Sequence, residues 1–204
     1  MQRQKELEAR DNGRCAAILV IDMQHDFLDA EGPIPCFGGQ DIVESLRMLL
    51  DFSREAGIAV IYTQEAHRAS RVDFGRELDY GETLHCLEGT RGIGIIPQLC
   101  PQNGDLMLIK RRYSAFFATD LDLLLRGLNV DTLVLTGVAT DVCVRATAQD
   151  AMQLDYHVVV PRECVAGTTL ERHKAALENI SYVFGKVQDL VDVIGDLRTG
   201  AATE

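Results

Sequence analysis

The sequence predicts an α/β protein with a three-layer α-β-α sandwich around a mostly parallel central sheet. Short apolar runs rich in β-branched residues alternate with longer runs that repeat apolar residues at helical spacing. A strand–helix alternation of this kind favours a parallel sheet covered by helices on both faces. The 204 residues are enough for one domain with a sizeable core, so a single domain over residues 1–204 is expected.

Two expected strands and one expected helix precede a long interruption, and a third expected strand follows it. Cys15 to Ile21 is apolar throughout, which is typical of a strand buried on both faces. Asp41 to Glu55 repeats apolar residues at helical spacing, and Gly57 ends that helix before a second strand over Ile58 to Tyr62. A third strand is expected over Leu106 to Ile109.

The second half continues the alternation. Asp120 to Leu128 carries a leucine repeat that favours a helix, and Thr132 to Thr136 is the fourth expected strand. A helix containing Cys143 then runs to about Leu154. The remaining expectations are strands over His157 to Val160 and Ser181 to Phe184, and helices over Leu170 to Asn179 and Val187 to Leu197.

Two regions depart from this rhythm. Residues 1–14 are polar and are expected to form an N-terminal extension without the apolar core of a signal peptide. Glu65 to Gly104 contains histidines, cysteines and glycines and no clear period. In α/β proteins such an insertion usually covers or builds the functional site.

Composition excludes several classes of function. The formal net charge of −11 argues against nucleic-acid binding and against an anionic membrane surface. No apolar run approaches the length of a membrane span. The six cysteines are scattered without a CxxC pair, which indicates a reduced, cytoplasmic protein rather than a disulfide scaffold or a zinc ribbon.

Cys143 is the most informative single residue. It follows the buried run Thr132 to Thr136 and Gly137, and Thr140 or Asp141 can cap the helix that it begins. The positive end of a helix dipole lowers the pKa of a thiol, so the position predicts a nucleophilic cysteine. A buried, inert cysteine is the competing interpretation.

Three chemically distinct side chains follow three of the expected strands. Asp22 follows the first strand, Lys110 the third and Cys143 the fourth. Ligand sites of open α/β sheets lie beyond the carboxyl ends of the strands, so the three groups are expected to meet there. A lysine beside the thiol lowers the pKa of that thiol, and an aspartate can move its proton, which together suit amide hydrolysis.

The segments that carry these residues resemble the cysteine hydrolase branch of the isochorismatase-like superfamily. That branch includes nicotinamidases, N-carbamoylsarcosine amidase, and ureidoacrylate and biuret hydrolases. The resemblance covers roughly residues 15 to 190, and its motifs are Val-Ile-Asp-Met-Gln-His-Asp-Phe (20–27), His-Cys-Leu-Glu-Gly-Thr-Arg-Gly (85–92), Lys-Arg-Arg-Tyr-Ser-Ala-Phe (110–116) and Thr-Gly-Val-Ala-Thr-Asp-Val-Cys-Val (136–144).

The resemblance implies roles for particular residues. Asp22, Lys110 and Cys143 match the family's catalytic triad, and the family's cis peptide falls between Val138 and Ala139. The backbone N–H groups of Ala139 and Cys143 would then form an oxyanion hole. Six further side chains are expected to contact substrate: Phe27, Glu65, His67, Tyr113, Phe116 and Thr140.

No metal and no cofactor are expected. Nicotinamidases of this superfamily hold a divalent metal with an Asp-x-His pair and a later histidine, whereas the corresponding stretch here offers only Glu65 and His67. His25, His85, His157 and His173 show no ligand spacing and are assigned no chemistry. The Thr-x-Glu-x-His-Arg pattern over residues 63–68 instead resembles members that act on linear ureido or carbamoyl compounds.

The resulting prediction is a metal-independent amidohydrolase that cleaves a C–N bond of a small amide, carbamoyl or ureido compound through an acyl-cysteine. Four competing functions stay open: a nicotinamidase, an isochorismatase-type vinyl-ether hydrolase, a catalytically silent binding protein and a peroxide-sensing thiol protein, although no resolving cysteine lies nearby in the sequence. The resemblance also implies a homo-oligomer, either a dimer or a tetramer. No nucleic acid or membrane partner is expected.

Overall fold

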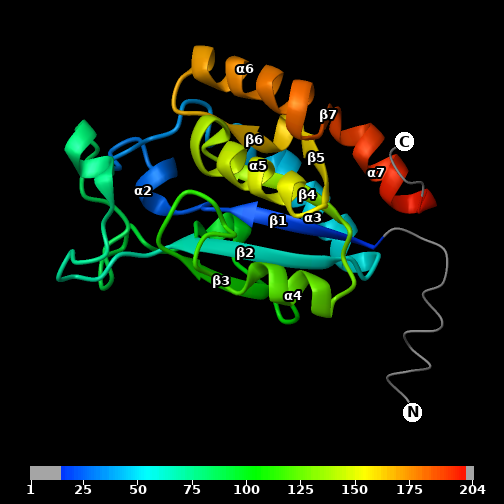
Figure 1. The fold of residues 1–204 in the computed structure, drawn as a ribbon, viewed down its shortest axis with the longest axis horizontal. Helices are drawn as coiled ribbons and strands as arrows, with labels where there is room; N and C mark the ends of the chain where they lie inside the picture. The colour runs from blue at the N-terminus through cyan, green and yellow to red at the C-terminus, as the bar shows by residue number, and fades with distance from the viewer. Residues whose placement is uncertain (1–14, 201–204) are drawn as a thin grey trace.

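A computed structural model describes residues 15–200 of the chain, and its architecture is the predicted α-β-α sandwich (Figure 1). The strands pair in the order β3-β2-β1-β4-β5-β7, every pairing is parallel, and β6 pairs with β4. The expected N-terminal extension, residues 1–14, lies outside the described residues. The strand bounds are β1 (Ala16–Ile21), β2 (Ala59–Glu65), β3 (Leu106–Lys110), β4 (Thr132–Val138), β5 (His157–Pro161), β6 (Val165–Ala166) and β7 (Lys186–Gln188).

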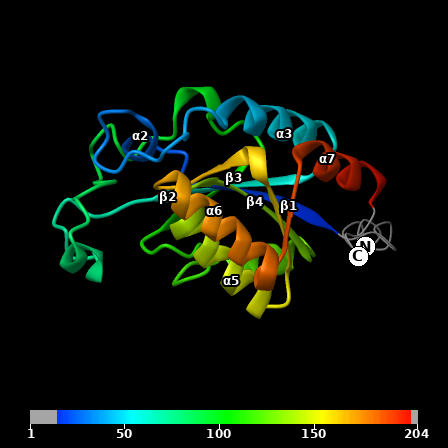
Figure 2. The same cartoon turned by 90° about the horizontal axis from the view of Figure 1, so that it is seen from above.

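Helices cover both faces of the sheet (Figure 2). α3 and α7 contribute to a hydrophobic cluster on one face, and α4 and α5 to a cluster on the other. The α-helices are α2 (His25–Leu28), α3 (Val43–Glu55), α4 (Leu121–Gly127), α5 (Arg145–Gln153), α6 (Leu170–Asn179) and α7 (Leu190–Thr199). Single helical turns complete the fold: η1 (Arg76–Tyr80), η2 (Pro97–Leu99), η3 (Thr140–Val144), η4 (Arg162–Cys164) and η5 (Ile180–Phe184).

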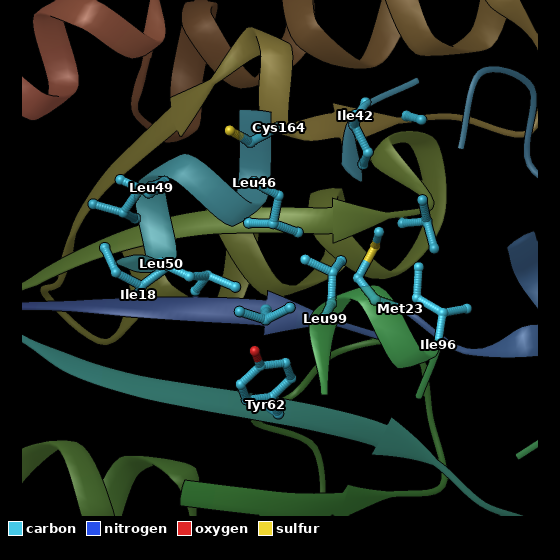
Figure 3. Close-up of a cluster of buried hydrophobic side chains, with 14 of the residues drawn as sticks. Ile18, Met23, Ile42, Leu46, Leu49, Leu50, Tyr62, Ile96, Leu99 and Cys164 are labelled. Carbon is cyan, nitrogen blue, oxygen red and sulfur yellow. The ribbon is translucent and has the colours of Figure 1, made fainter. Parts of the chain in front are cut away.

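The core on the α3 side follows directly from the helical spacing of the sequence. Leu46, Leu49 and Leu50 project from α3 onto the sheet, where they meet Ile18 and Tyr62 (Figure 3). Each of these side chains is almost completely buried. Full burial of one such apolar side chain contributes about 1.5–3 kcal/mol, so this face anchors the strands that carry the site.

The end of the chain differs from the prediction. Ser181 to Phe184, expected as the final strand, belongs to the helical turn η5 that continues α6. Ile180 and Phe184 of this helical turn pack in the same hydrophobic cluster as α5. The final strand is instead Lys186–Gln188, which pairs with β5. It overlaps the start of the helix that was expected over Val187 to Leu197.

The insertion between β2 and β3 crosses the carboxyl ends of the strands. An isolated bridge joins His67 to Leu87, and another joins Gln24 to Ile95. Asp26 fastens the same insertion because its carboxylate accepts a hydrogen bond from the Cys86 N–H at 2.6 Å. The insertion therefore closes over the edge of the sheet where the site was expected. Among residues 15–200, no helix is long and apolar enough to cross a membrane.

Candidate active site

Four neighbouring strands deliver polar side chains to one edge of the sheet. Lys110 ends β3, Glu65 ends β2, and Asp22 directly follows β1. Cys143 lies in η3, which follows β4. These strands are adjacent in the sheet, and Glu65 and Lys110 are register partners, so the four side chains converge.

Lys110 is the centre of this group. Its Nζ lies 2.7 Å from Asp22 Oδ2, 2.8 Å from Glu65 Oε2 and 3.0 Å from the carbonyl oxygen of Arg112. It also lies 3.5 Å from the Sγ of Cys143. An ammonium group has three hydrogen-bond donors, and those of Lys110 go to Glu65 Oε2, the Arg112 carbonyl and the Cys143 Sγ, whereas Asp22 is its ion-pair partner. The side chain is fully buried, which leaves its charge dependent on the two carboxylates.

Asp22 is held by a reciprocal pair of hydrogen bonds with Thr63 on β2. The Thr63 hydroxyl donates to Asp22 Oδ1 at 2.7 Å, and the Asp22 N–H donates to Thr63 Oγ1 at 3.2 Å. One oxygen of Asp22 therefore faces Thr63 and the other faces Lys110. An oxygen of Asp22 and the Sγ of Cys143 lie within 4.8 Å of each other, close enough for proton exchange after small adjustments.

The two carboxylates differ in proton affinity. Burial raises the pKa of Asp22, the Lys110 charge opposes that rise, and the Glu65 charge adds to it. Burial also acts to raise the pKa of Glu65. However, the Lys110 charge and hydrogen bonds from His67 and His85 outweigh it and hold that pKa well below its usual value. Burial acts against the Lys110 ammonium, but the charges of Asp22, Cys143 and Glu65 raise the pKa of Lys110 well above its usual value. Glu65 is therefore the permanent counter-ion of Lys110, and Asp22 is the carboxylate that can take up a proton.

The prediction of a lowered thiol pKa is wrong. Burial raises the pKa of Cys143 well above its usual value, Lys110 opposes this, and the charges of Asp22 and Glu65 add to it. Cys143 does lie in the first helical turn after β4, as the sequence indicates. The two carboxylates and the loss of water outweigh the nearby ammonium, so the resting group is a thiol that needs a base.

The end of β4 is shaped by Gly137 and the next peptide bond. Gly137 has a φ of +94°, and a Cβ on it would collide with the backbone carbonyl of Ile21. Only glycine allows β1 and β4 to approach this closely, which brings Asp22 near Cys143. The peptide bond between Val138 and Ala139 is cis, at the position that the family resemblance implies.

α6 secures the turn that holds Cys143. The Thr140 Oγ1 and the Nδ1 of His173 are 2.9 Å apart. The carboxylate of Asp141 accepts the Thr168 N–H at 2.8 Å and the Thr168 hydroxyl at 2.5 Å. Thr140 was expected to contact substrate, but its side chain is buried against α6. Its place in the structure suits a support for η3.

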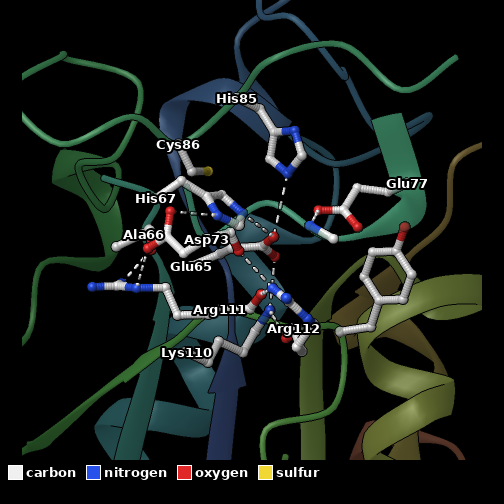
Figure 4. Close-up of polar contacts among 12 residues, drawn as sticks. Glu65, Ala66, His67, Asp73, Glu77, His85, Cys86, Lys110, Arg111 and Arg112 are labelled. Atoms are coloured by element: carbon white, nitrogen blue, oxygen red, sulfur yellow. Dashed lines mark hydrogen bonds and ion pairs between the residues drawn. The ribbon is translucent and has the colours of Figure 1, made fainter. Parts of the chain in front are cut away.

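Two buried histidines meet the other oxygen of Glu65. The Nε2 atoms of His67 and His85 each lie 3.2 Å from Glu65 Oε1 (Figure 4). Nδ1 of His85 donates to the carbonyl oxygen of Thr83 at 2.7 Å. Burial acts to lower the pKa of His85, but the hydrogen bond and charge of Glu65 outweigh it and raise that pKa. His85 had been assigned no chemistry, because it lies twenty residues from Glu65 on the insertion.

The same three residues have the arrangement of a metal site. One donor atom each from Glu65, His67 and His85 lies within 4.8 Å of the other two, and all three side chains are buried. Two imidazoles and a carboxylate are typical ligands of zinc and similar ions. The bond from His85 to Thr83 leaves Nε2 free to bind an ion when the ring is neutral. The insertion therefore supplies the third donor that the local sequence around Glu65 and His67 lacks.

A small cavity of about 30 Å³ lies beside Cys143. Phe27, Glu65, Tyr113, Ala139 and Cys143 line it, as expected. Six other lining residues were not expected to contact substrate: Ile34, Cys36, Glu82, His85, Val142 and Thr168.

Besides Thr140, two further predicted substrate contacts do not line this cavity. His67 is completely buried behind Glu65, and the ring of Phe74 is stacked on it with centroids 3.8 Å apart. Phe116 lies against the α5 side of the core, where its ring packs on that of Tyr156 at 5.8 Å. The loop after β3 turns Tyr113 toward the cavity and Phe116 into the core.

Gln24 is a further residue whose contribution the sequence did not reveal. Its Nε2 donates to the carbonyl oxygens of Glu65 and Ile93 at 2.8 and 2.9 Å. Its Oε1 accepts the Glu65 N–H at 2.8 Å. Gln24 thus fixes the backbone of Glu65 and ties the insertion to the end of β2.

Comparison with known proteins agrees with this geometry. A family model described as the isochorismatase domain matches residues 16–192. The chain belongs to the isochorismatase family. A solved isochorismatase-like hydrolase from Alkaliphilus metalliredigens has 39% identity and a TM-score of 0.82, with 89% of this chain and 98% of that chain covered.

Three curated relatives have names that state an activity. Maleamate amidohydrolase from Pseudomonas putida is 34% identical and covers 91% of this chain and 88% of its own. Ureidoacrylate amidohydrolase from Yersinia enterocolitica is 31% identical, with 86% of each chain covered. An Arabidopsis thaliana protein described as a probable inactive nicotinamidase is 34% identical and covers 87% of this chain and 93% of its own.

Proposed function

We propose that this isochorismatase-family protein is a cysteine-dependent amidohydrolase that cleaves a C–N bond of a small amide, carbamoyl or ureido compound. The observation that carries the proposal is the contact of Lys110 with Asp22, Glu65 and Cys143 in one buried group. A thiol beside a carboxylate of raised pKa and a fixed ammonium suits acyl transfer. The amidohydrolases among the curated relatives support the same reaction class.

The first half of the reaction forms an acyl-cysteine. Asp22 accepts the proton of the Cys143 thiol, and the sulfur attacks the carbonyl carbon of the substrate. Lys110 offsets the negative charge on the sulfur as it forms. The backbone N–H groups of Ala139 and Cys143 are proposed to hold the carbonyl oxygen as it becomes an oxyanion. Asp22 then gives its proton to the leaving nitrogen, the C–N bond breaks, and ammonia or an amine departs.

The second half returns the enzyme to its resting state. Asp22, again ionised, accepts a proton from a water molecule, and the resulting hydroxide attacks the acyl carbon. The C–S bond breaks and the carboxylic or carbamic acid leaves, while Asp22 returns the proton to the sulfur of Cys143. The raised pKa of Asp22 supports its role in this shuttle, because it makes the carboxylate a stronger base toward the thiol proton.

Glu65, His67 and His85 are the residues that would hold a divalent ion. When bound, such an ion would polarise a heteroatom of the substrate and help to orient it. Without one, Glu65 anchors Lys110 through Oε2 and accepts hydrogen bonds from both histidines through Oε1. This ligand set favours a nicotinamidase as the second candidate function, since nicotinamidases of the superfamily use a metal.

Vinyl-ether hydrolysis and a silent binding role are less well supported. Vinyl-ether hydrolysis of the isochorismatase type does not use the cysteine, so it leaves the position of Cys143 beside Lys110 and Asp22 without a purpose. A silent binding protein is compatible with the relative described as probably inactive. Such a protein has no need for two buried carboxylates that share one lysine, an arrangement that is costly to desolvate.

Ammonia release separates these possibilities. Wild type and Cys143→Ala are incubated with biuret, ureidoacrylate, N-carbamoylsarcosine, nicotinamide and simple amides, each with and without a chelator. Turnover by the wild type that is lost in Cys143→Ala supports the cysteine amidohydrolase. Turnover of nicotinamide alone, abolished by the chelator, would support the second candidate. The absence of ammonia from every compound would contradict both proposals.

A further inference from the structure

The cavity beside Cys143 borders a larger outer cleft. The outer cleft has a volume of about 820 Å³ and is lined mainly by η1, η3 and α6. Five residues line both spaces and therefore lie at the boundary between them, which is called the passage below: Ile34, Glu82, Tyr113, Val142 and Thr168. The inner cavity has about the volume of one water molecule in the liquid. A substrate held at Cys143 must therefore extend between these five residues.

Glu82 supplies a carboxylate to this passage. The Tyr113 hydroxyl donates to Glu82 Oε2 at 2.8 Å. No lysine, arginine or histidine side chain within residues 15–200 forms an ion pair with Glu82. Thr168 is already engaged, since its hydroxyl donates to Asp141. An ionised carboxylate accepts about four hydrogen bonds, so Glu82 retains acceptor capacity toward a molecule in the passage.

No cation of the inner site is free to neutralise an acidic group on the substrate. Lys110 directs its three donors to Glu65, the Arg112 carbonyl and the Cys143 sulfur, and it forms an ion pair with Asp22. His67 and His85 both face Glu65. A substrate carboxylate in the passage would therefore lie beside Glu82 with no opposing charge, which is unfavourable. An N–H group at the same place would donate to Glu82.

Two arginines line the outer cleft and could in principle attract an anion. The Nε of Arg145 donates to Asn179 Oδ1 at 2.8 Å, and its guanidinium lies 5.5 Å above the ring of Phe184. Arg172 is exposed, and one of its Nη atoms lies 3.3 Å from Thr168 Oγ1. Arg172 is therefore the one of the two that can reach toward the passage, and it provides the test for an acidic substrate.

We propose that the substrate is neutral and ends in a primary amide or urea group, and that Glu82 selects it by accepting N–H hydrogen bonds from that end. This inference rests on the proposed amidohydrolase function and specifies its substrate class. The substrate class proposed here differs from the one named for the P. putida relative, maleamate amidohydrolase. Maleamate carries a carboxylate at the position where the diamide maleamide carries a second amide.

The experiment compares the matched pair maleamide and maleamate, with biuret as a ureido compound. Values of kcat/KM are measured for wild type, Glu82→Gln and Arg172→Gln, and thermal unfolding confirms that each variant is folded. The wild type is expected to prefer maleamide and biuret over maleamate by at least about tenfold, which corresponds to 1.4 kcal/mol. Glu82→Gln is expected to reduce the maleamide-to-maleamate ratio at least about tenfold, chiefly through KM. Arg172→Gln should leave the ratio unchanged.

The outcomes distinguish this inference from the proposed function. If no compound is hydrolysed by the wild type, the amidohydrolase proposal itself fails. If hydrolysis depends on Cys143 but maleamate is preferred, and Arg172→Gln removes that preference, the amidohydrolase stands and the role of Glu82 is refuted. A ratio that is unchanged in Glu82→Gln would also overturn the inference.

Discussion

Replacing Lys110 with methionine is expected to destabilise the protein strongly, because the change leaves two buried carboxylates without their shared cation. Lys110 is fully buried, and Asp22 and Glu65 are 0% and 3% exposed. Removing one partner from a buried, hydrogen-bonded charge group typically costs about 3–5 kcal/mol. For a chain of this length, 1 kcal/mol corresponds to about 2–4 °C, so the melting temperature should fall by about 6–20 °C.

Urea unfolding followed by far-UV circular dichroism measures this loss, since the chain contains no tryptophan. Lys174→Met makes the same chemical change at an exposed position and should alter stability by less than about 0.5 kcal/mol. Glu65→Gln leaves Lys110 paired with Asp22 and should cost less than Lys110→Met.

The double variant of Lys110→Met and Glu65→Gln provides the decisive comparison. It removes one of the two stranded carboxylates, so it should be more stable than the sum of the single losses by about 0.5–3 kcal/mol. The reasoning would be refuted if Lys110→Met unfolded within about 1 kcal/mol of the wild type, or if the two single losses simply added.

Four further outcomes are expected. Cys143→Ala should lower kcat at least about 10³-fold while leaving the melting temperature within a few degrees of wild type, as measured by ammonia release and circular dichroism. The acid limb of the kcat/KM profile against pH should lie above the usual aspartate range. As the pH falls through the raised pKa of Asp22, this base becomes protonated and activity is lost. A limb near pH 4 would contradict this. Burial lowers the pKa of His173, so its contribution to stability is complete above about pH 6.5 and lost as the pH falls below that value, and the melting temperature of His173→Gln should depend less on pH over that range. Zinc should bind one-to-one to wild type in calorimetry and not to His85→Ala, whereas equal binding by both would exclude the proposed ligand set.

The sheet and its order of elements could be predicted because each central strand is apolar on both faces. β1, β2 and β4 carry that pattern, and the helices between them repeat leucines at helical spacing. Ser181 to Phe184 was misassigned because a run as short as Ser-Tyr-Val-Phe does not distinguish a strand from the end of a helix. The packing of Ile180 and Phe184 beside α5 decided the outcome, and that contact lies outside the local sequence.

The site residues that could be predicted are those that directly follow a recognisable strand. Asp22, Lys110 and Cys143 each follow an apolar run, whereas β2 continues past its apolar part through polar residues to Glu65. Glu65 was recognised as a substrate contact but not as the partner of Lys110. His85 could not be placed, because its approach to Glu65 depends on the path of a non-periodic insertion.

The direction of the pKa shift of the Cys143 thiol could not be predicted from the sequence, because it also depends on how distant segments pack. Sequence shows the helix start at Cys143 and the lysine that follows β3. It does not show that two carboxylates and the insertion enclose the sulfur, and these contributions reverse the expected direction.

Full burial of Lys110 separates the reacting groups from the salt of the surrounding medium. Mobile ions screen exposed charges over about 8 Å at physiological ionic strength but reach buried pairs poorly. The ion pairs of Lys110 with Asp22 and Glu65 should therefore keep their strength across a wide range of salt concentration. The charged residues of the outer cleft remain open to screening, whereas ionic strength should leave the chemical step at Cys143 largely unchanged.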